Sequence, residues 1–158
     1  MKQLKLKIIT PERLILEEMV DQVSIPTKLG EITILPNHIP LITEITSGDI
    51  VALIDGEHIP MAVVGGFLEV KKPVRNTSDS DAGGDENITE VTVLADFAEH
   101  VKELGEEAIE KAKTRAEELK EKMKDKEIVD YEHFATELER SLTRVRIADK
   151  WKTKKYRK

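Results

Sequence analysis

The side chains that most often do chemistry stand far apart in this 158-residue chain. The four histidines, His38, His58, His100 and His133, form no cluster in the sequence, and no His-Glu-x-x-His, Gly-x-Ser-x-Gly or phosphate-loop pattern is present. Cysteine is absent, which excludes disulfide bonds and thiolate metal ligands. Because no nucleophile stands beside a base and no ligands cluster, the sequence predicts a protein that is not an enzyme.

One polar segment has the spacing of a calcium-binding loop. Ligand and turn positions of such a loop are occupied by Asp79, Asp81, Gly84, Asn87 and Glu90. Gly83 takes the place of a carboxylate ligand, however, and Glu86 replaces the usual apolar residue. A metal-dependent enzyme built on this loop is therefore a weak alternative, and we interpret residues 73–90 as a polar inserted loop with no metal.

Basic residues are concentrated at the C-terminal end of the sequence. The formal net charge is −6, yet residues 140–158 contain nine basic residues and one acidic residue. Trp151 and Tyr156 lie among these cations, as in segments that bind nucleic acid or an anionic membrane. A solvated terminus and an acidic protein partner are the other interpretations. The negative charge of the whole chain argues against nucleic acid.

Up to residue 97 the apolar residues follow the two-residue period of half-buried strands. Leu4 and Leu6 alternate with lysines, for example, and the Asp55-Gly56 pair joins two apolar runs as a tight hairpin turn does. Many short strands separated by turn residues are typical of a sandwich. We therefore expect residues 1–97 to form an N-terminal antiparallel β-sandwich.

From residue 98 the apolar residues follow the period of a helix. A first stripe contains Val101, Leu104, Ala108, Ala112, Ala116, Leu119 and Met123. A second stripe contains Phe134, Leu138, Leu142, Val145 and Ala148. The short polar break between the stripes predicts that residues 98–158 form a C-terminal two-helix antiparallel hairpin with a basic tail. Since the stripes are narrow and rich in alanine, we expect this hairpin to dock weakly.

Four strings in this order of elements resemble the epsilon subunit of the bacterial-type F-type ATP synthase. They are ITPER at residues 9–13, GEITILPNHIPLI at 30–42, GGFLEV at 65–70 and VTVLAD at 91–96. The resemblance implies a non-catalytic rotor subunit whose sandwich docks on the gamma subunit and the ring of c subunits. It also implies a position at the cytoplasmic face of the bacterial membrane, held only through the complex. The long polar loop departs from the family, whose members cross there with a short turn.

The resemblance assigns two sets of contact residues. In the family, the loop that corresponds to residues 31–42 faces the c ring, and here it offers Glu31, Pro36, Asn37, His38 and Pro40. In the family's inhibitory state the helices extend along gamma into the alpha/beta catalytic head, where basic side chains meet an acidic region. The basic residues implied here are Arg144, Arg146, Lys150 and Lys152. We expect the long tail to strengthen this insertion, so that loss of residues 149–158 would relieve inhibition.

Some bacterial members of the family bind ATP between the two helices as a regulatory ligand. The positions that resemble their site are Glu99, Arg115, Arg140 and Arg144. Gly105 and Ala108, however, stand where the family motif has an aspartate and an arginine. The loss of one charged anchor of each sign weighs against nucleotide binding, and no cofactor is expected. The alternative function is a β-sandwich binding module whose basic tail holds nucleic acid or an anionic membrane.

Overall fold

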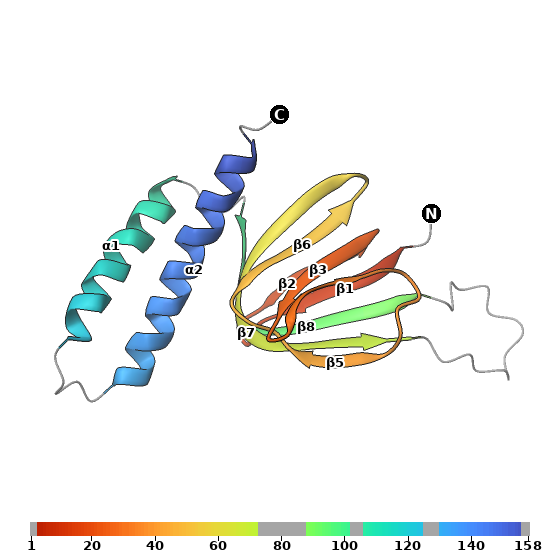
Figure 1. Ribbon diagram of the computed structural model, residues 1–158, viewed down its shortest axis with the longest axis horizontal. Coiled ribbons are helices and arrows are strands. Elements are labelled where there is room, and N and C mark those ends of the chain that lie inside the picture. Colours follow the sequence, from red (N-terminus) through yellow and green to blue (C-terminus); the bar gives the residue numbers. More distant parts are fainter. Residues whose placement is uncertain (1–2, 73–87, 102–105, 125–129, 156–158) are drawn as a thin grey trace, which may run out of the picture.

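A computed structural model describes residues 3–72, 88–101, 106–124 and 130–155 as a β-sandwich with two helices at one end (Figure 1). The predicted order, sandwich first and helical pair second, is confirmed. The elements are β1 (Leu4–Ile9), β2 (Leu14–Val20), β3 (Gln22–Thr27), β4 (Gly30–Ile34), β5 (Leu41–Glu44), β6 (Gly48–Ile54), β7 (Glu57–Lys71), β8 (Thr89–His100), α1 (Glu106–Lys122) and α2 (Tyr131–Lys155).

The sheet order is β2-β1-β8-β7-β6-β3-β4, with β5 paired to β7. Neighbouring strands are antiparallel with one exception, because β1 and β8 run parallel, with Leu4 opposite Thr89 and Ile9 opposite Leu94. These two strands are distant in the sequence and no hairpin joins them, so no turn constrains their relative direction. Local sequence patterns therefore could not predict this parallel pair.

Alternating side chains along the strands build the core of the sandwich. In β1, Leu4, Leu6 and Ile8 are fully buried while Lys5 and Lys7 face outward. The rest of this core consists of Val20, Val23, Ile25, Ile34, Ile45, Ile50, Ala52, Met61, Val63, Leu68, Val70, Val91, Val93, Ala95 and Ala98. Because none of these residues belongs to α1 or α2, the sandwich completes its core without the helices.

The predicted hairpin turn at Asp55-Gly56 is confirmed. Ile54 pairs with Glu57, and the two residues between them have φ angles of 50° and 82°. Two successive positive φ angles define a type I′ turn, whose twist matches that of the flanking strands. This turn fixes the register of β6 against β7, and so places Asp49 opposite Ala62.

The long strand β7 changes partners at a pair of glycines. Its first part pairs with β6 up to Val63, and its later part pairs with β5 from Phe67 onward. Between these parts, Gly65 and Gly66 have φ angles of 57° and 117°, which side chains with a Cβ rarely adopt. A Cβ atom on Gly66 would lie 2.1 Å from the carbonyl oxygen of Leu94. The bend of β7 thus depends on close backbone contact with β8.

The boundary between sandwich and helices, and the buried face of α2, differ in detail from the sequence prediction. Strand β8 continues to His100, past the expected boundary at residue 97, because its register with β7 extends to the pair formed with Met61. Val101 therefore precedes α1, and Leu104 lies outside the described residues. In α2 the most buried apolar side chains are Ile147 and Ala148, whereas the predicted Leu142 and Val145 are half-buried. The reason is that α2 contacts both α1 and strands β6 and β7, so its buried surface is wider than one stripe.

Two sequence predictions fall wholly or partly on residues that the structure does not describe. The calcium-like positions from Asp79 to Asn87 lie outside the described residues, as does most of the predicted polar loop. Within the described parts of the chain, neither helix combines the length and apolar character that a bilayer crossing requires.

We predict that Gly66→Ala destabilises the sandwich by about 3–5 kcal/mol, because the new methyl group would collide with the backbone of β8. Thermal or urea unfolding of the full chain measures this loss. The matched control is Gly56→Ala, where φ is 82° but no atom lies within 4 Å of the new Cβ. This variant should lose only about 1–2 kcal/mol. Equal losses in the two variants would contradict the close approach of β7 and β8.

Candidate functional site

The segment predicted to face the c ring is an exposed loop fixed at its centre. His38 donates its backbone N–H to the carbonyl of Leu35, and Asn37 donates its own to the hydroxyl of Thr89 at 2.8 Å. Thr89 is almost fully buried at the start of β8, and Asn37 has a positive φ of 69°. These contacts hold the turn to the sandwich.

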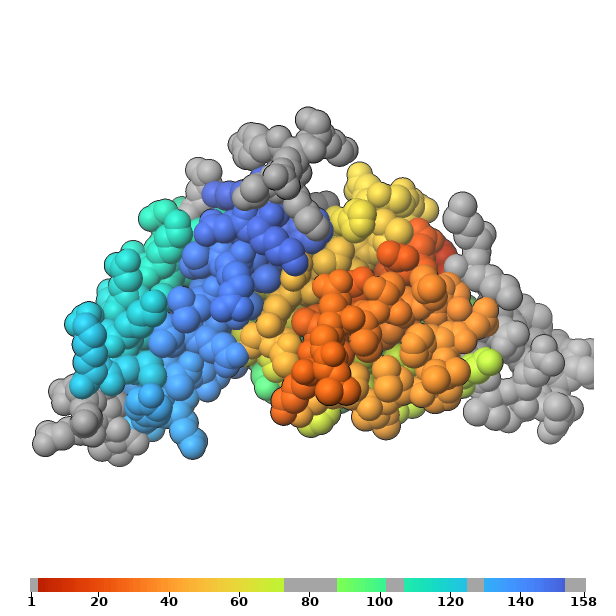
Figure 2. Space-filling view, in the orientation of Figure 1, coloured from red at the N-terminus to blue at the C-terminus, as the bar shows by residue number. Residues whose placement is uncertain are grey.

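All five residues predicted for this contact belong to β4 or to the loop that follows it, in the part of the chain coloured orange in Figure 2. Glu31, Asn37 and Pro40 are exposed, whereas Pro36 and His38 are half-buried. Prolines and a tethered turn reduce the ordering cost of binding. The loop therefore has the properties of a preformed docking surface.

An apolar row crosses the outer face of the sheet, and the sequence analysis missed it. Leu14, Ile9, Leu94 and Phe67 are successive partners across β2, β1, β8 and β7. The side chains of Phe67 and Leu94 are 58% and 53% exposed. One sequence signal could have indicated it: Leu94 is apolar but stands between two inward-facing residues of β8, so its side chain must point outward. The register of the strands was still needed to align Leu94 with the other residues of the row.

The helices meet the sandwich through a second, smaller apolar cluster. It contains Ala62 from β7, Ile109 from α1, and Ile147 and Ala148 from α2, with Val101 and Trp151 packed at its edge. Near the other end of α2, the Ser47 hydroxyl donates a hydrogen bond to Glu139. This cluster is separate from the core of the sandwich.

Arg144 and Lys150, both predicted to be inhibitory cations, form ion pairs with the sandwich. Arg144 Nε lies 2.6 Å from the Glu99 carboxylate at the end of β8. Lys150 Nζ lies 2.8 and 2.7 Å from the two carboxylate oxygens of Asp49 on β6. Arg146 and Lys152 are exposed on the same helix. The basic end of α2 is thus partly neutralised by acidic residues of the sandwich.

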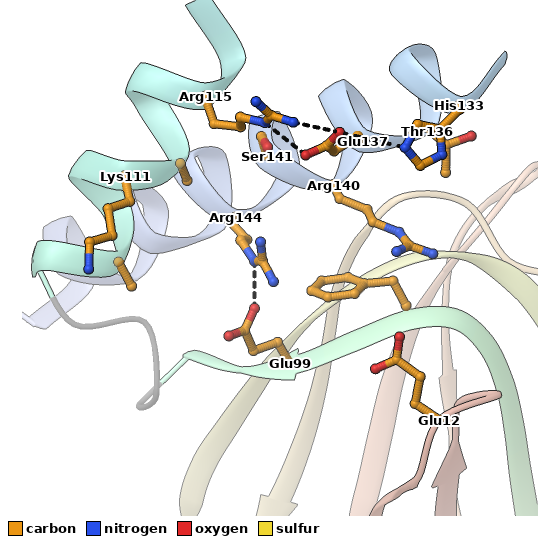
Figure 3. Close-up of a pocket in the computed structure, with 13 residues that line it drawn as sticks. Glu12, Glu99, Lys111, Arg115, His133, Thr136, Glu137, Arg140, Ser141 and Arg144 are labelled. Atoms are coloured by element: carbon orange, nitrogen blue, oxygen red, sulfur yellow. Dashed lines mark hydrogen bonds and ion pairs between the residues drawn. The ribbon is translucent and has the colours of Figure 1, made fainter. Parts of the chain in front are cut away.

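All four predicted nucleotide-site residues line one open cleft of about 950 Å³ between α1, α2 and the end of β8 (Figure 3). The charged side chains around it are Glu12, Glu99, Lys111, Arg115, Glu137, Arg140 and Arg144. The predicted residues are therefore close together in space although they are distant in the sequence. Ala108 lines the cleft as well, with only a methyl group where the family motif has an arginine, and Gly105 lies outside the described residues.

The arginines of this cleft already have partners within the protein. Arg115 makes two hydrogen bonds to the Glu137 carboxylate, at 2.8 and 3.2 Å. Arg140 and Arg144 lie over the ring of Phe97, 5.5 and 4.7 Å from its centroid. A phosphate group would have to displace a carboxylate to obtain a bidentate contact with Arg115.

The Arg115–Glu137 pair also joins the two helices electrostatically. The hydrogen bond from the guanidinium lowers the pKa of Glu137 from its ordinary value of 4.5, and the same bond raises the pKa of Arg115. Sequence analysis assigned Arg115 to the cleft but missed Glu137, because nothing in their spacing indicates a contact between different helices.

The histidines remain separated in the structure. His38 contacts the carbonyl of Ile39, His58 lies near Trp151, and His133 lies 4.0 Å from Glu137. Among the described residues, no three histidine, aspartate or glutamate side chains gather as metal ligands would.

Comparison with known proteins matches residues 3–74 to the family described as "ATP synthase, Delta/Epsilon chain, beta-sandwich domain". The "ATP synthase epsilon chain" of Nitratidesulfovibrio vulgaris is 36% identical over 92% of this chain and 96% of its own length. The protein of the same name from Dehalococcoides mccartyi is 38% identical over 95% of both chains. A chain of the Euglena gracilis mitochondrial ATP synthase, in a structure containing OSCP, F1 and c-ring, has a TM-score of 0.61 at 21% identity. It covers 88% of this chain and 77% of its own, and supports the fold.

We predict that Glu137→Gln makes the helix pair less sensitive to acid. The pKa of Glu137 is lower in the folded state than its ordinary value of 4.5. The ionised carboxylate therefore contributes fully to folding stability above a pH of about 4.5, and this contribution is lost as the pH falls through the lowered pKa. Urea titrations followed by NMR of the α1 and α2 amides at pH 6 and pH 3 measure this difference. The wild type should lose more stability between the two pH values than Glu137→Gln does.

The matched control is Glu121→Gln, which removes an exposed ion pair with Lys124 within the α1 region. The readout is confined to the helices because the pKa of Glu17 in the sandwich is also lowered, by a hydrogen bond from Lys5. Equal acid sensitivity in Glu137→Gln and the wild type would contradict the prediction.

Proposed function

The chain belongs to the ATP synthase epsilon chain family, and from this we propose that it couples gamma to the c ring and restrains ATP hydrolysis through its C-terminal helices. As a member of that family it is a non-catalytic subunit of the ATP synthase. The observation that carries the proposal is the small interface between the helices and a sandwich that has its own core. Such an interface can open without unfolding the rest of the protein.

The size of the apolar contact supports a hinged arrangement. Ile109 and Ile147 are the large side chains of the second cluster, and burial of each contributes about 1.5–3 kcal/mol. Ala62 and Ala148 contribute less because they are smaller. If the docked and extended conformations differ in free energy by a few kcal/mol, binding to a partner can reverse which one is favoured. The docked helices are therefore one of two conformations in the proposed mechanism.

Charge supports the second conformation. Arg144 and Lys150 pair with Glu99 and Asp49 when the helices are docked. If the helices extend, these cations become available to an acidic surface of the alpha/beta catalytic head, together with the exposed Arg146 and Lys152. An ionic contact there would oppose rotation of the central stalk during hydrolysis.

The sandwich supplies the proposed stationary contacts within the rotor. We assign the loop with Glu31, Pro36, Asn37, His38 and Pro40 to the c ring, because it is exposed and fixed at its centre. We assign the apolar row on the outer sheet face to gamma, since an apolar row is a suitable surface for a permanent protein contact. These contacts would hold the chain at the cytoplasmic face of the bacterial membrane only through the complex, without nucleic acid.

A regulatory ATP site is the second candidate function, favoured by the convergence of Glu99, Arg115, Arg140 and Arg144 on one cleft. The partners already present in the cleft and the small Ala108 oppose it. We therefore propose that the protein carries no resident nucleotide.

We predict that Arg146→Gln relieves inhibition. The side chain is exposed in the docked form, so its loss should leave that form intact and weaken only the extended one. ATP hydrolysis by membranes with the assembled synthase should rise about two- to fivefold at low salt, as expected for loss of one ionic contact. The increase should shrink as salt screens the contact.

The control for this experiment is Lys120→Gln, which removes the same charge from the exposed surface of α1. Its hydrolysis rate should match the wild type. If Arg146→Gln also matches the wild type at low salt, the proposed contribution of this residue to inhibition is wrong.

We predict that calorimetry with millimolar ATP gives no binding heat for the wild-type chain. The double variant Gly105→Asp with Ala108→Arg should gain measurable binding, because it restores both charged anchors of the family motif. Measurable heat with the wild type would contradict the proposal that the cleft is too well neutralised.

A further inference from the structure

Asp49 is a buried carboxylate that accepts hydrogen bonds from the far end of the chain. Of the charged residues that the structure describes, it alone is buried, with 7% of its surface exposed. A buried carboxylate without hydrogen bonds is strongly unfavourable, so the location of its donors matters. The donors are Lys150 and Trp151, about a hundred residues away in the sequence, on α2.

The two donors use both oxygens of the carboxylate. Lys150 Nζ contacts Oδ1 and Oδ2 at 2.8 and 2.7 Å, and Trp151 Nε1 donates to Oδ2 at 3.0 Å. A hydrogen bond with a charged partner is stronger than a neutral one. Because the lysine and tryptophan are consecutive, any movement of this end of α2 away from β6 breaks all three hydrogen bonds together.

The polar contact is continuous with the apolar one. Asp49 lies opposite Ala62 in the ladder between β6 and β7, and Ala62 belongs to the cluster with Ile147 and Ala148. Trp151 packs at the edge of the same cluster. The last described turns of α2 therefore meet the sandwich as one unit, in which Asp49 supplies the acceptor.

We propose that Asp49, Lys150 and Trp151 form a latch that holds the basic end of α2 on the sandwich. The latch is a property of the chain alone, whereas its consequence for hydrolysis rests on the proposed function above. Lys150 cannot pair with Asp49 and with an acidic surface of another subunit at once. A partner must therefore compete with Asp49 for this cation.

The latch gives part of the basic tail a role opposite to the one expected from the sequence. That expectation assigned residues 149–158 to strengthening the inserted state. Lys150 and Trp151 instead stabilise the docked state, so that deletion of the whole tail removes contacts from both conformations. A substitution at Asp49 separates the two roles because it leaves the tail unchanged.

The first test uses the isolated full-length chain. Trp151 is the single tryptophan of the sequence, so its fluorescence reports directly on the latch. Asp49→Asn preserves the size of the side chain, and it should shift the Trp151 emission to longer wavelength. It should also speed hydrogen exchange of the amides at residues 147–152 about tenfold, as expected for loss of a charged hydrogen bond.

Two further variants make this test specific. Glu121→Gln removes a similar charge from the exposed surface near the end of α1 and should change neither readout. Lys150→Gln should act like Asp49→Asn, and the double variant should exceed the single ones only slightly, because both remove the same contact. Unchanged exchange among the core amides of β1 would verify that the sandwich is intact. Wild-type emission and exchange in Asp49→Asn would overturn the latch.

The second test uses the assembled ATP synthase. Asp49→Asn should lower ATP hydrolysis about two- to tenfold, since it releases α2 without altering the cations that would insert. This is opposite in direction to the effect expected for Arg146→Gln. If Arg146→Gln changes hydrolysis and Asp49→Asn does not, the regulatory role of the latch is overturned. If neither variant changes hydrolysis while exchange is faster in Asp49→Asn, the inhibitory function fails and the latch remains.

Discussion

The arrangement of this protein depends on a sandwich that buries its apolar residues without help from the helices. The core between the strands includes no side chain from α1 or α2. The sandwich core therefore does not need the helices, which are held at the edge of the sandwich by β6, β7, the end of β8 and Ser47 just before β6. In the proposed function, this separation lets the sandwich keep a fixed place in the assembly while the helices change position.

The distribution of charge complements this separation. The last nineteen residues of the sequence are strongly basic, whereas the sandwich and the first helix carry a negative excess. In the docked form the two signs meet at Glu99 with Arg144 and at Asp49 with Lys150. The chain thus contains its own acidic surface for its basic end, so any external acidic surface is a competitor and not the first partner.

Local patterns allowed much of the fold to be predicted, because they report on neighbouring residues. The alternation of Leu4 and Leu6 and the Asp55-Gly56 turn each determine structure within a few positions, and both are confirmed. Contacts between distant elements leave no such signal. The parallel pairing of β1 with β8 and the exposed row through Leu94 require the register of strands that meet only in the folded state. The Asp49–Lys150 contact requires the docking of α2 on β6. The four cleft residues were grouped by resemblance to a family, since their spacing alone does not predict that they meet.

The parallel pairing of β1 with β8 also bears on the order in which the protein forms during synthesis. Leu4 leaves the ribosome early, but its partner Thr89 follows only after most of the sandwich has been made. Contacts between such distant residues slow folding, and the β1 edge that will receive β8 stays unpaired until then. Strand β8 leads directly toward the helices in the sequence. The residues that close the sheet are therefore synthesised before α2, the helix that docks on the finished sandwich.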